Sequence, residues 1–273
     1  MKELASVIMP VYNNSIYLTD SIEGILNQTY KDLELIIVDD CSTDLDVRDI
    51  LKGYENNDHR VKTLFCEKNQ GPGIARNIGI NEARGRYLAF CDSDDIWLPE
   101  KLDKQISFLK ERNCALCYSS FWIIDDTKGI RGFAYAPEKL TLNQLKKDNK
   151  IGCSTAVMDI ERTGKVFMPD IKKRQDWAYF LILLKNCGNA FGISEPLILY
   201  TRHSSSVSSR KMSLFKYNAQ IYQIVFGYSI ARSYVYLILV FLPSYFIKKA
   251  GNKILFMKQK RLFKQHPAGT LII

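Results

Sequence analysis

Short apolar runs alternate with amphipathic stretches along the first 112 residues of this chain. Four of the apolar runs predict buried strands, at residues 6–9, 33–38, 61–65 and 87–91. The stretches that follow them have helical spacing, at residues 16–28, 44–54, 72–84 and 99–112. Strands that alternate with helices in this way form a mostly parallel sheet with helices on both faces. We therefore expect an α/β fold.

The second half of the chain has a mixed pattern and then changes character. Strands are predicted at 116–120, 154–158 and 197–200, with a helix near 177–187. From residue 214 the chain becomes strongly apolar, and Lys and Arg residues follow residue 247. We therefore expect one domain over residues 1–210, with halves at 1–112 and 113–210, and a helical basic and apolar tail over residues 211–273.

Polar clusters follow four of the predicted strands, at residues 12–14, 39–40, 69–71 and 92–95. The carboxyl ends of parallel strands meet at one edge of the sheet, where such sheets bind their ligands. Asp92 and Asp94 are oxygen ligands of the kind that Mg²⁺ or Mn²⁺ takes together with substrate phosphates. An acidic turn that caps the next helix is the alternative interpretation.

A Gly-rich turn at residues 69–77 leads into a helix that carries Arg76. A helix start of this kind favours an anionic ligand. The turn is not GxGxxG and does not follow the first strand, so the pattern disfavours a dinucleotide-binding fold.

The formal net charge of +9 requires an anionic partner, which can be nucleic acid, an anionic membrane or a phosphorylated substrate. The basic residues concentrate in the tail and do not alternate with aromatic residues on a sheet, which disfavours nucleic acid. Seven Cys without a regular spacing, and a strand close to the N-terminus, indicate a reduced, cytoplasmic chain. Cys114 and Cys117 would face opposite sides of a strand, so we do not expect them to share a metal.

Four segments together resemble glycosyltransferase family 2, the inverting enzymes of the nucleotide-diphospho-sugar (GT-A) fold. They are residues 7–13 (VIMPVYN), 36–44 (IIVDDCSTD), 69–79 (NQGPGIARNIG) and 85–99 (GRYLAFCDSDDIWLP). The acidic segment at 92–95 looks like that of bacterial O-antigen and capsule transferases. The resemblance implies that residues 1–112 bind a nucleotide-sugar and that residues 113–210 bind the acceptor.

The resemblance also assigns roles to single residues. The donor would be bound by Pro10, Val11, Tyr12, Asn13, Asp40, Asn69, Gly71, Arg76, Asp92, Ser93 and Arg202. Asp94 would be the main ligand of a Mn²⁺ or Mg²⁺ cofactor, with Asp92 and His203 as further ligands.

The family has an acidic motif before a helix in its second half, and residues 172–177 (KKRQDW) fit it. Asp176 would be the catalytic base, although this chain has Gln175 where the family often has Glu. A helix cap is the alternative role for Asp176. The acceptor would be contacted by Asp95, Trp97, Ser154, Thr155, Gln175 and Trp177.

The implied reaction is a metal-assisted single displacement. A UDP-linked hexose or N-acetylhexosamine would be transferred to a hydroxyl of a lipid-linked saccharide in O-antigen or capsule synthesis. A nucleotidyltransferase is one alternative, but its Gly-rich loop after the first strand is replaced here by residues 10–14 (PVYNN). A non-catalytic nucleotide-sugar-binding protein is the other, and the acidic residues Asp92, Asp94 and Asp176 argue against it.

Residues 221–247 are about as long as a membrane span, but Gln223, Arg232 and Pro243 interrupt them. The basic residues that follow favour an anionic membrane surface. We expect one or two helices in the interface, which would make the protein peripheral on the inner face of the cytoplasmic membrane. A true span is one alternative, and a helix pair packed on the domain or in a homodimer is the other.

Overall fold

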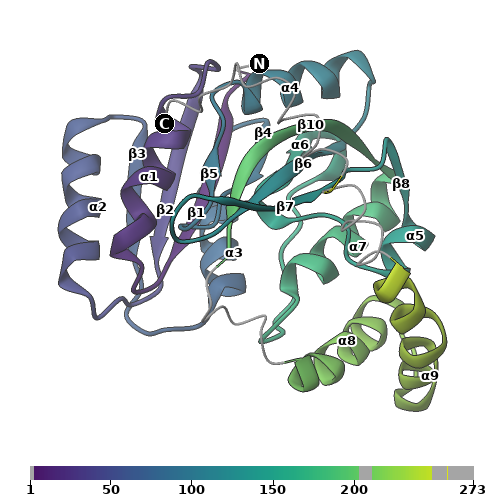
Figure 1. Cartoon of the computed structure of the whole chain (residues 1–273). Helices are drawn as coiled ribbons and strands as arrows, with labels where there is room; N and C mark the ends of the chain where they lie inside the picture. Colours follow the sequence, from purple (N-terminus) through teal and green to yellow (C-terminus); the bar gives the residue numbers. More distant parts are fainter. Residues whose placement is uncertain (1–2, 203–210, 248–256, 258–273) are drawn as a thin grey trace.

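The computed structural model describes residues 3–202, 211–247 and 257, and it contains one ten-stranded sheet with helices on both faces (Figure 1). The strands are β1 (Ala5–Val11), β2 (Leu33–Asp39), β3 (Val61–Phe65), β4 (Tyr87–Phe90), β5 (Ile96–Trp97), β6 (Leu116–Ile124), β7 (Ile130–Ala134), β8 (Lys139–Thr141), β9 (Ala156–Asp159) and β10 (Asn189–Thr201). The helices are α1 (Ser15–Leu26), α2 (Leu45–Asn57), α3 (Pro72–Glu82), α4 (Lys101–Glu111), α5 (Leu142–Lys147), α6 (Ile160–Thr163), α7 (Gln175–Cys187), α8 (Lys211–Phe226) and α9 (Ile230–Tyr236).

The sheet order is β3-β2-β1-β4-β9-β6-β10-β5, with β7 paired to β6 and β8 paired to β10. The first four strands in this order are parallel, as the alternating pattern predicts. Strand β9 is antiparallel to both of its neighbours, and β5, β7 and β8 also pair in the antiparallel sense. The predicted α/β fold is confirmed, with a sheet that is parallel in its first half and mixed in its second.

Strand β1 is buried on both faces, and its side chains divide between two cores. Val7 and Met9 belong to the core under α1 and α4, whereas Ile8 belongs to the core under α3 and α7. Helix α3 approaches β1 closely at Gly79, where an added Cβ would lie 2.4 Å from Cγ2 of Ile8. A larger residue at position 79 would therefore push α3 away from the sheet.

The predicted strand at residues 6–9 continues through Pro10 to Val11. Pairing between β1 and β4 ends at Ile8, so one side of β1 has no strand partner at Pro10. A proline is tolerated there because its missing N–H removes no hydrogen bond between strands. This extra length brings Tyr12 and the residues after it to the carboxyl edge of the sheet.

The described part of the predicted tail packs on the domain. Helix α8 buries Ile221 and Tyr222 in the same core as α7, and Leu237 and Phe241 from the following helix join them. Beyond α9 the chain stays helical through a π-helical turn at Leu237–Phe241 and on to residue 247. By length and composition, Ile230–Ile247 is able to cross a membrane, and it is mostly exposed on the domain.

Candidate active site

The carboxyl ends of β1, β2 and β4 lie together, and Asp40 joins two of the predicted ligand-binding turns. Its Oδ1 accepts a hydrogen bond from the Gln70 amide at 2.8 Å, and its Oδ2 accepts one from the Gly71 amide at 2.7 Å. Gly71 has a φ of 89°, a left-handed conformation that glycine adopts without strain. Asp40 is buried and fixes the turn that begins α3, so the start of this helix has a defined position at the sheet edge.

Arg76, in the second turn of α3, forms an ion pair with Asp92 at the end of β4. The arginine side chain is 7% exposed and the aspartate side chain 32% exposed. Burial by itself would lower the pKa of the Arg76 guanidinium, but nearby negative groups, including Asp92 and Asp176, hold that pKa above its usual range. The guanidinium is therefore a fixed positive charge beside the acidic turn, and it also interacts electrostatically with Asp176 at the start of α7.

The acidic turn after β4 is held by hydrogen bonds within the protein. Ser93 Oγ accepts from Asn14 Nδ2 at 2.9 Å, and the Asp92 amide donates to Ser154 Oγ at 3.0 Å. The Ser154 hydroxyl in turn donates to Asp95, whose other carboxylate oxygen accepts from the Thr201 amide at 3.2 Å. Asp95 and Ser154 are buried. Burial, together with the nearby carboxylates of Asp94 and Asp92, raises the pKa of Asp95 well above its usual range.

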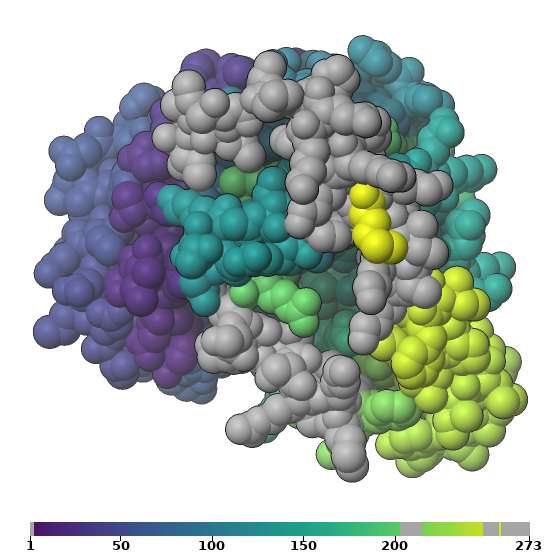
Figure 2. Space-filling model, in the orientation of Figure 1, coloured from purple at the N-terminus to yellow at the C-terminus, as the bar shows by residue number. Residues whose placement is uncertain are grey.

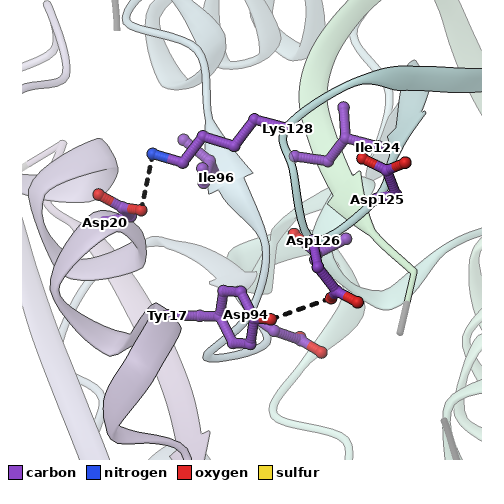
Figure 3. A pocket seen from close by; sticks show the side chains of 9 residues that line it. Tyr17, Asp20, Asp94, Ile96, Ile124, Asp125, Asp126 and Lys128 are labelled. Carbon is purple, nitrogen blue, oxygen red and sulfur yellow. Dashed lines mark hydrogen bonds and ion pairs between the residues drawn. The ribbon is translucent and has the colours of Figure 1, made fainter. Parts of the chain in front are cut away.

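Asp94 lines a small cavity between α1 and the turn that joins β6 to β7 (Figure 3). In this cavity Tyr17 Oη donates to Asp126 Oδ1 at 2.9 Å, and Lys128 Nζ lies 3.0 Å from Asp20 Oδ2. These two contacts fix the β6–β7 turn to α1 next to the Asp94 carboxylate. Asp94 is half-buried and therefore reachable from the cavity.

Asp176 lies in the first turn of α7, where its negative charge is favourable. The N-cap of this helix is Arg174, in a left-handed conformation with a φ of 68°, so the helix-cap interpretation of Asp176 is wrong. Asp176 Oδ2 instead accepts a hydrogen bond from Asn149 Nδ2 at 3.1 Å. Its half-buried carboxylate lies in the same electrostatic neighbourhood as Arg76.

Several predicted acceptor residues are enclosed by the protein. Trp97 is 2% exposed and Trp177 is fully buried, because β5 and α7 pack these indoles into the two cores. Both indoles fill the cores here, and their predicted contacts with an acceptor stay a prediction. Thr155 is buried as well and donates to the Gly152 carbonyl at 2.7 Å. Buried Gln175 packs against Gly73, where an added Cβ would lie 2.8 Å from Gln175 Cγ.

Asp95 and Ser154 are likewise buried and bonded to each other, and their predicted contacts with an acceptor also stay a prediction. Their carboxylate and hydroxyl hold the acidic turn, and with it Asp92 and Asp94, against the neighbouring strands.

The remaining predicted donor residues differ in exposure. Pro10 and Val11 are buried in β1, whereas Tyr12 is 49% exposed and Asn69 and Arg202 are exposed. Asn13 is exposed too, and its Oδ1 accepts from the amides of Thr43 at 2.8 Å and Asp44 at 3.1 Å. That side chain supports the loop after β2.

The predicted metal ligand His203 lies outside the described residues. Within residues 3–202 and 211–247, no three His, Cys, Asp or Glu side chains form a ready metal site. Mg²⁺ commonly binds one or two carboxylates and completes its shell with waters and substrate phosphates. Asp94, beside Asp92, fits a divalent ion of that kind, because its half-buried carboxylate lines the small cavity next to α1 and follows a strand end.

Three residues in the site were not predicted from the sequence. Asn14 supports Ser93, Tyr17 shares the Asp94 cavity, and Asn149 binds Asp176. The position of Asn14 directly after the predicted donor residues was a usable signal. Tyr17 is part of the site because the β6–β7 turn folds against α1, and Asn149 because the loop after α5 folds against α7. No local sequence pattern predicts either of these two contacts.

The model of a known family, described as "Glycosyl transferase family 2", matches residues 6–162. A Bacillus subtilis protein named "Putative teichuronic acid biosynthesis glycosyltransferase TuaG" is 42% identical over 81% of this chain and 88% of its own length. An Escherichia coli protein named "UDP-Glc:alpha-D-GlcNAc-diphosphoundecaprenol beta-1,3-glucosyltransferase WfgD" is 36% identical over 78% of this chain and 83% of its own.

Among solved structures, that of S. aureus TarS 1-349 in complex with UDP-GlcNAc superposes with a TM-score of 0.69. It is 22% identical, and the match covers 89% of this chain and 72% of TarS 1-349. The mixed sheet, the acidic turn after β4 and these similarities define a sugar-transferring enzyme. The chain belongs to glycosyltransferase family 2.

Proposed function

We propose that this glycosyltransferase transfers a hexose or N-acetylhexosamine from UDP to a hydroxyl of a lipid-linked saccharide, with inversion at the anomeric carbon. The observation that carries the proposal is the meeting of three elements at one sheet edge. Helix α3 brings Arg76, the end of β4 brings Asp92 and Asp94, and the start of α7 brings Asp176. The acidic turn and the candidate base thus both interact with one fixed positive charge.

The relatives support the choice of donor and acceptor. WfgD is named for transfer from UDP-Glc to a GlcNAc-diphosphoundecaprenol acceptor, and TuaG for teichuronic acid biosynthesis. TarS binds UDP-GlcNAc in a structure of the same fold. A UDP-linked donor and a lipid-diphosphate saccharide acceptor are therefore the first substrates to test, in the synthesis of a surface polysaccharide.

In the proposed reaction, Asp176 takes the proton of the acceptor hydroxyl while that oxygen attacks the anomeric carbon. The bond from that carbon to the diphosphate oxygen breaks, and its electron pair leaves with UDP. A Mn²⁺ or Mg²⁺ ion with Asp94 as its main ligand, and Asp92 and His203 as the further ligands that the family resemblance implies, would neutralise the charge on the leaving diphosphate. Arg76 keeps Asp92 in place, and exposed Arg202 would contact the phosphates.

We also propose that the C-terminal helices attach the enzyme to the inner face of the cytoplasmic membrane. Helix Ile230–Ile247 buries Leu237 and Phe241 against the domain and exposes a second apolar surface. That surface consists of Ile230, Tyr234, Val235, Ile238, Leu239, Phe246 and Ile247. An apolar helix face followed in sequence by Lys and Arg is typical of helices that lie in an anionic membrane interface. A homodimer through the same face is the alternative.

The decisive experiment offers the purified chain a panel of UDP-sugars, with Mn²⁺ or Mg²⁺ and a synthetic lipid-diphosphate GlcNAc acceptor. We expect one glycosylated product of inverted anomeric configuration, seen by mass spectrometry and NMR, and free UDP in equal amount. Release of pyrophosphate instead would identify a nucleotidyltransferase. If the chain binds UDP-sugars but neither transfers the sugar nor slowly hydrolyses the donor, it is a non-catalytic binding protein.

A further inference from the structure

Lys146, at the end of α5, is surrounded by aromatic rings from the C-terminal helices. Its Nζ lies 4.3 Å from the ring centre of Phe226, 4.6 Å from that of Tyr228 and 4.8 Å from that of Tyr236. It also donates a hydrogen bond to Tyr228 Oη. An ammonium over several aromatic faces is held by the negative charge of those faces. The C-terminal segment that begins with α8 therefore holds the Lys146 side chain of α5 in place.

Two further hydrogen bonds hold the backbone at the same end of α5. Tyr222 Oη, from α8, donates to the Lys146 carbonyl at 3.0 Å. Trp177 Nε1, from α7, donates to the Leu145 carbonyl at 2.8 Å. Consecutive carbonyls of α5 are thus bound by α7 and by α8, so this helix end connects the C-terminal helices to the helix that carries Asp176.

The loop that leaves α5 reaches the candidate base. Asn149 follows Lys146 by three residues, and its Nδ2 donates to Asp176 Oδ2 at 3.1 Å. The same amide group accepts from the Ile151 amide at 3.3 Å through Oδ1, which fixes the orientation of the side chain. Asp176 is therefore held from a loop whose starting point depends on Lys146.

The neighbour of Asp176 is held from the same side. The Trp177 ring packs edge-on against Tyr222, with ring centres 5.9 Å apart. It also packs in a tilted arrangement against Phe241, with ring centres 5.3 Å apart. Tyr222 belongs to α8 and Phe241 to the π-helical turn after α9. Both routes to Asp176, through Asn149 and through Trp177, begin in the C-terminal helices.

We propose that the C-terminal helices position Asp176 for proton transfer, with Lys146 and Asn149 as positioning residues. This inference rests on the proposed role of Asp176 as base. It gives the helices a catalytic task besides attachment to a membrane. A misplacement of about 1 Å at a reacting group is able to cost roughly 10²-fold in rate, so a loosened loop after α5 is enough to slow the reaction.

The test uses the full chain and compares Lys146→Met, Lys146→Arg and Asn149→Ala with wild type. Lys147→Met is the matched control, because Lys147 is exposed on the same helix end and lies outside the aromatic cluster. Measurements are kcat and the KM for the UDP-sugar at a temperature well below unfolding, with the melting temperature of each variant. We expect Lys146→Met and Asn149→Ala to lower kcat by about 10-fold to 10²-fold, the range set by loss of position, without changing the donor KM.

Lys146→Arg is expected to keep most of the wild-type kcat, because a guanidinium also stacks on aromatic rings. Wild-type kcat in both Lys146→Met and Asn149→Ala would overturn the proposal. So would a fall in melting temperature with kcat unchanged, which marks a purely structural contact. Asp176→Asn tests the role of Asp176 as base separately from the positioning role of Lys146 and Asn149. If that variant turns over like wild type, the base assignment itself fails; if it is inactive while the positioning variants are normal, only this inference fails.

Discussion

The guanidinium of Arg76 is ion-paired with Asp92, and Asp176, from the other half of the chain, adds to the negative charge that acts on it. Asp92 follows β4, and Asp176 begins α7. A buried arginine with one ion-pair partner is costly to disturb, because breaking the pair leaves a charge without compensation. This pair links the stability of the fold to the geometry of the candidate site.

Replacing Arg76 by Met is expected to lower the free energy of unfolding by roughly 2–4 kcal/mol, somewhat less than for a fully buried pair because Asp92 keeps partial access to water. Urea unfolding of the variant checks the value. Lys62→Met is the control, since the Lys62–Glu82 pair is exposed and such pairs contribute at most about 1 kcal/mol. Equal losses in the two variants would contradict the importance of the buried pair.

Asp94→Asn is expected to keep the fold and lose the dependence of donor binding on Mn²⁺. The half-buried carboxylate lines a cavity and contributes little to the core, but it is the best-placed ligand for a divalent ion at the acidic turn. Calorimetric titration of UDP with and without Mn²⁺ measures the effect directly. Asp20→Asn changes an acid in the same cavity that pairs with Lys128, and it should leave the Mn²⁺ dependence intact. Full metal dependence in Asp94→Asn would remove this residue from the metal site.

The α/β alternation of the first 112 residues predicted β1 to β4 and α1 to α4 well, and the strand at residues 61–65 was predicted to the residue. Buried parallel strands are continuous apolar runs and the helices between them are amphipathic, so both signals are local. Asp44, where the predicted helix at 44–54 begins, is the N-cap of α2 and accepts from the Asp46 amide. Local chemistry is enough to define such a position.

Contacts between distant segments were not predictable in the same way. Strands β5 and β8 have two and three residues, too few to show a period, and β10 runs through Pro196 with shifts in register. Trp97 and Trp177 lie beside the motif residues in sequence, yet their side chains point into the core. Which face of a strand or helix meets the substrate depends on the layers packed behind it, and short motifs do not encode that.

Gly79→Ala is expected to destabilise the protein by about 1–3 kcal/mol, because the new methyl group would lie 2.4 Å from Cγ2 of the buried Ile8. Adding Ile8→Val should not restore the loss, because valine lacks only Cδ1 and keeps the Cγ2 methyl group that the new Cβ meets. Gly53→Ala on α2 is the control: nothing lies within 4 Å of its added Cβ, so it should stabilise by up to about 1 kcal/mol. Thermal unfolding of the three variants is sufficient, and a neutral Gly79→Ala would show that α3 and β1 can separate at no cost.

Lys101 is fully buried, with its Nζ 3.8 Å above the Trp97 ring and no hydrogen-bond partner among the described residues. Burial lowers the pKa of its ammonium from 10.5 to about 7. Above pH 7 the folded chain therefore releases a proton that the unfolded chain keeps up to about pH 10.5. The unfolded state binds more protons in this window, so the Lys101 contribution to the free energy of unfolding rises with pH and is most unfavourable at or below pH 7.

Lys101→Met is accordingly expected to stabilise the protein most at pH 7 and below, with an advantage that shrinks by about 1.4 kcal/mol per pH unit above it. Urea unfolding between pH 6.5 and 8.5 tests this. Higher pH is avoided because burial raises the pKa of the Cys91 and Cys117 thiols, which adds an opposite dependence. An advantage that stays constant over this range would show that Lys101 does not titrate near neutrality.

The exposed apolar face of Ile230–Ile247 makes the membrane proposal testable without truncation, which would remove the core residues Ile221 and Tyr222. Ile238 is 55% exposed and Leu239 is 69% exposed. The C-terminal helices form the yellow-green part of the molecule (Figure 2), on the opposite side from α2 (Figure 1). Burying one such side chain is worth about 1.5–3 kcal/mol, so replacing both by Gln should weaken binding to anionic vesicles at least tenfold.

Leu45→Gln on α2 is the matched control, because Leu45 is 77% exposed on the opposite side and should not contact the bilayer. Flotation with vesicles rich in phosphatidylglycerol, against vesicles of phosphatidylcholine alone, separates the charge contribution from the apolar one. Partial extraction by high salt or carbonate fits helices in the interface, whereas complete resistance to both points to a span. Light scattering in the absence of lipid tests the homodimer. If the wild-type protein is a dimer that the Ile238 and Leu239 substitutions dissociate, and if it does not bind anionic vesicles, this face binds a second copy of the chain instead of a membrane.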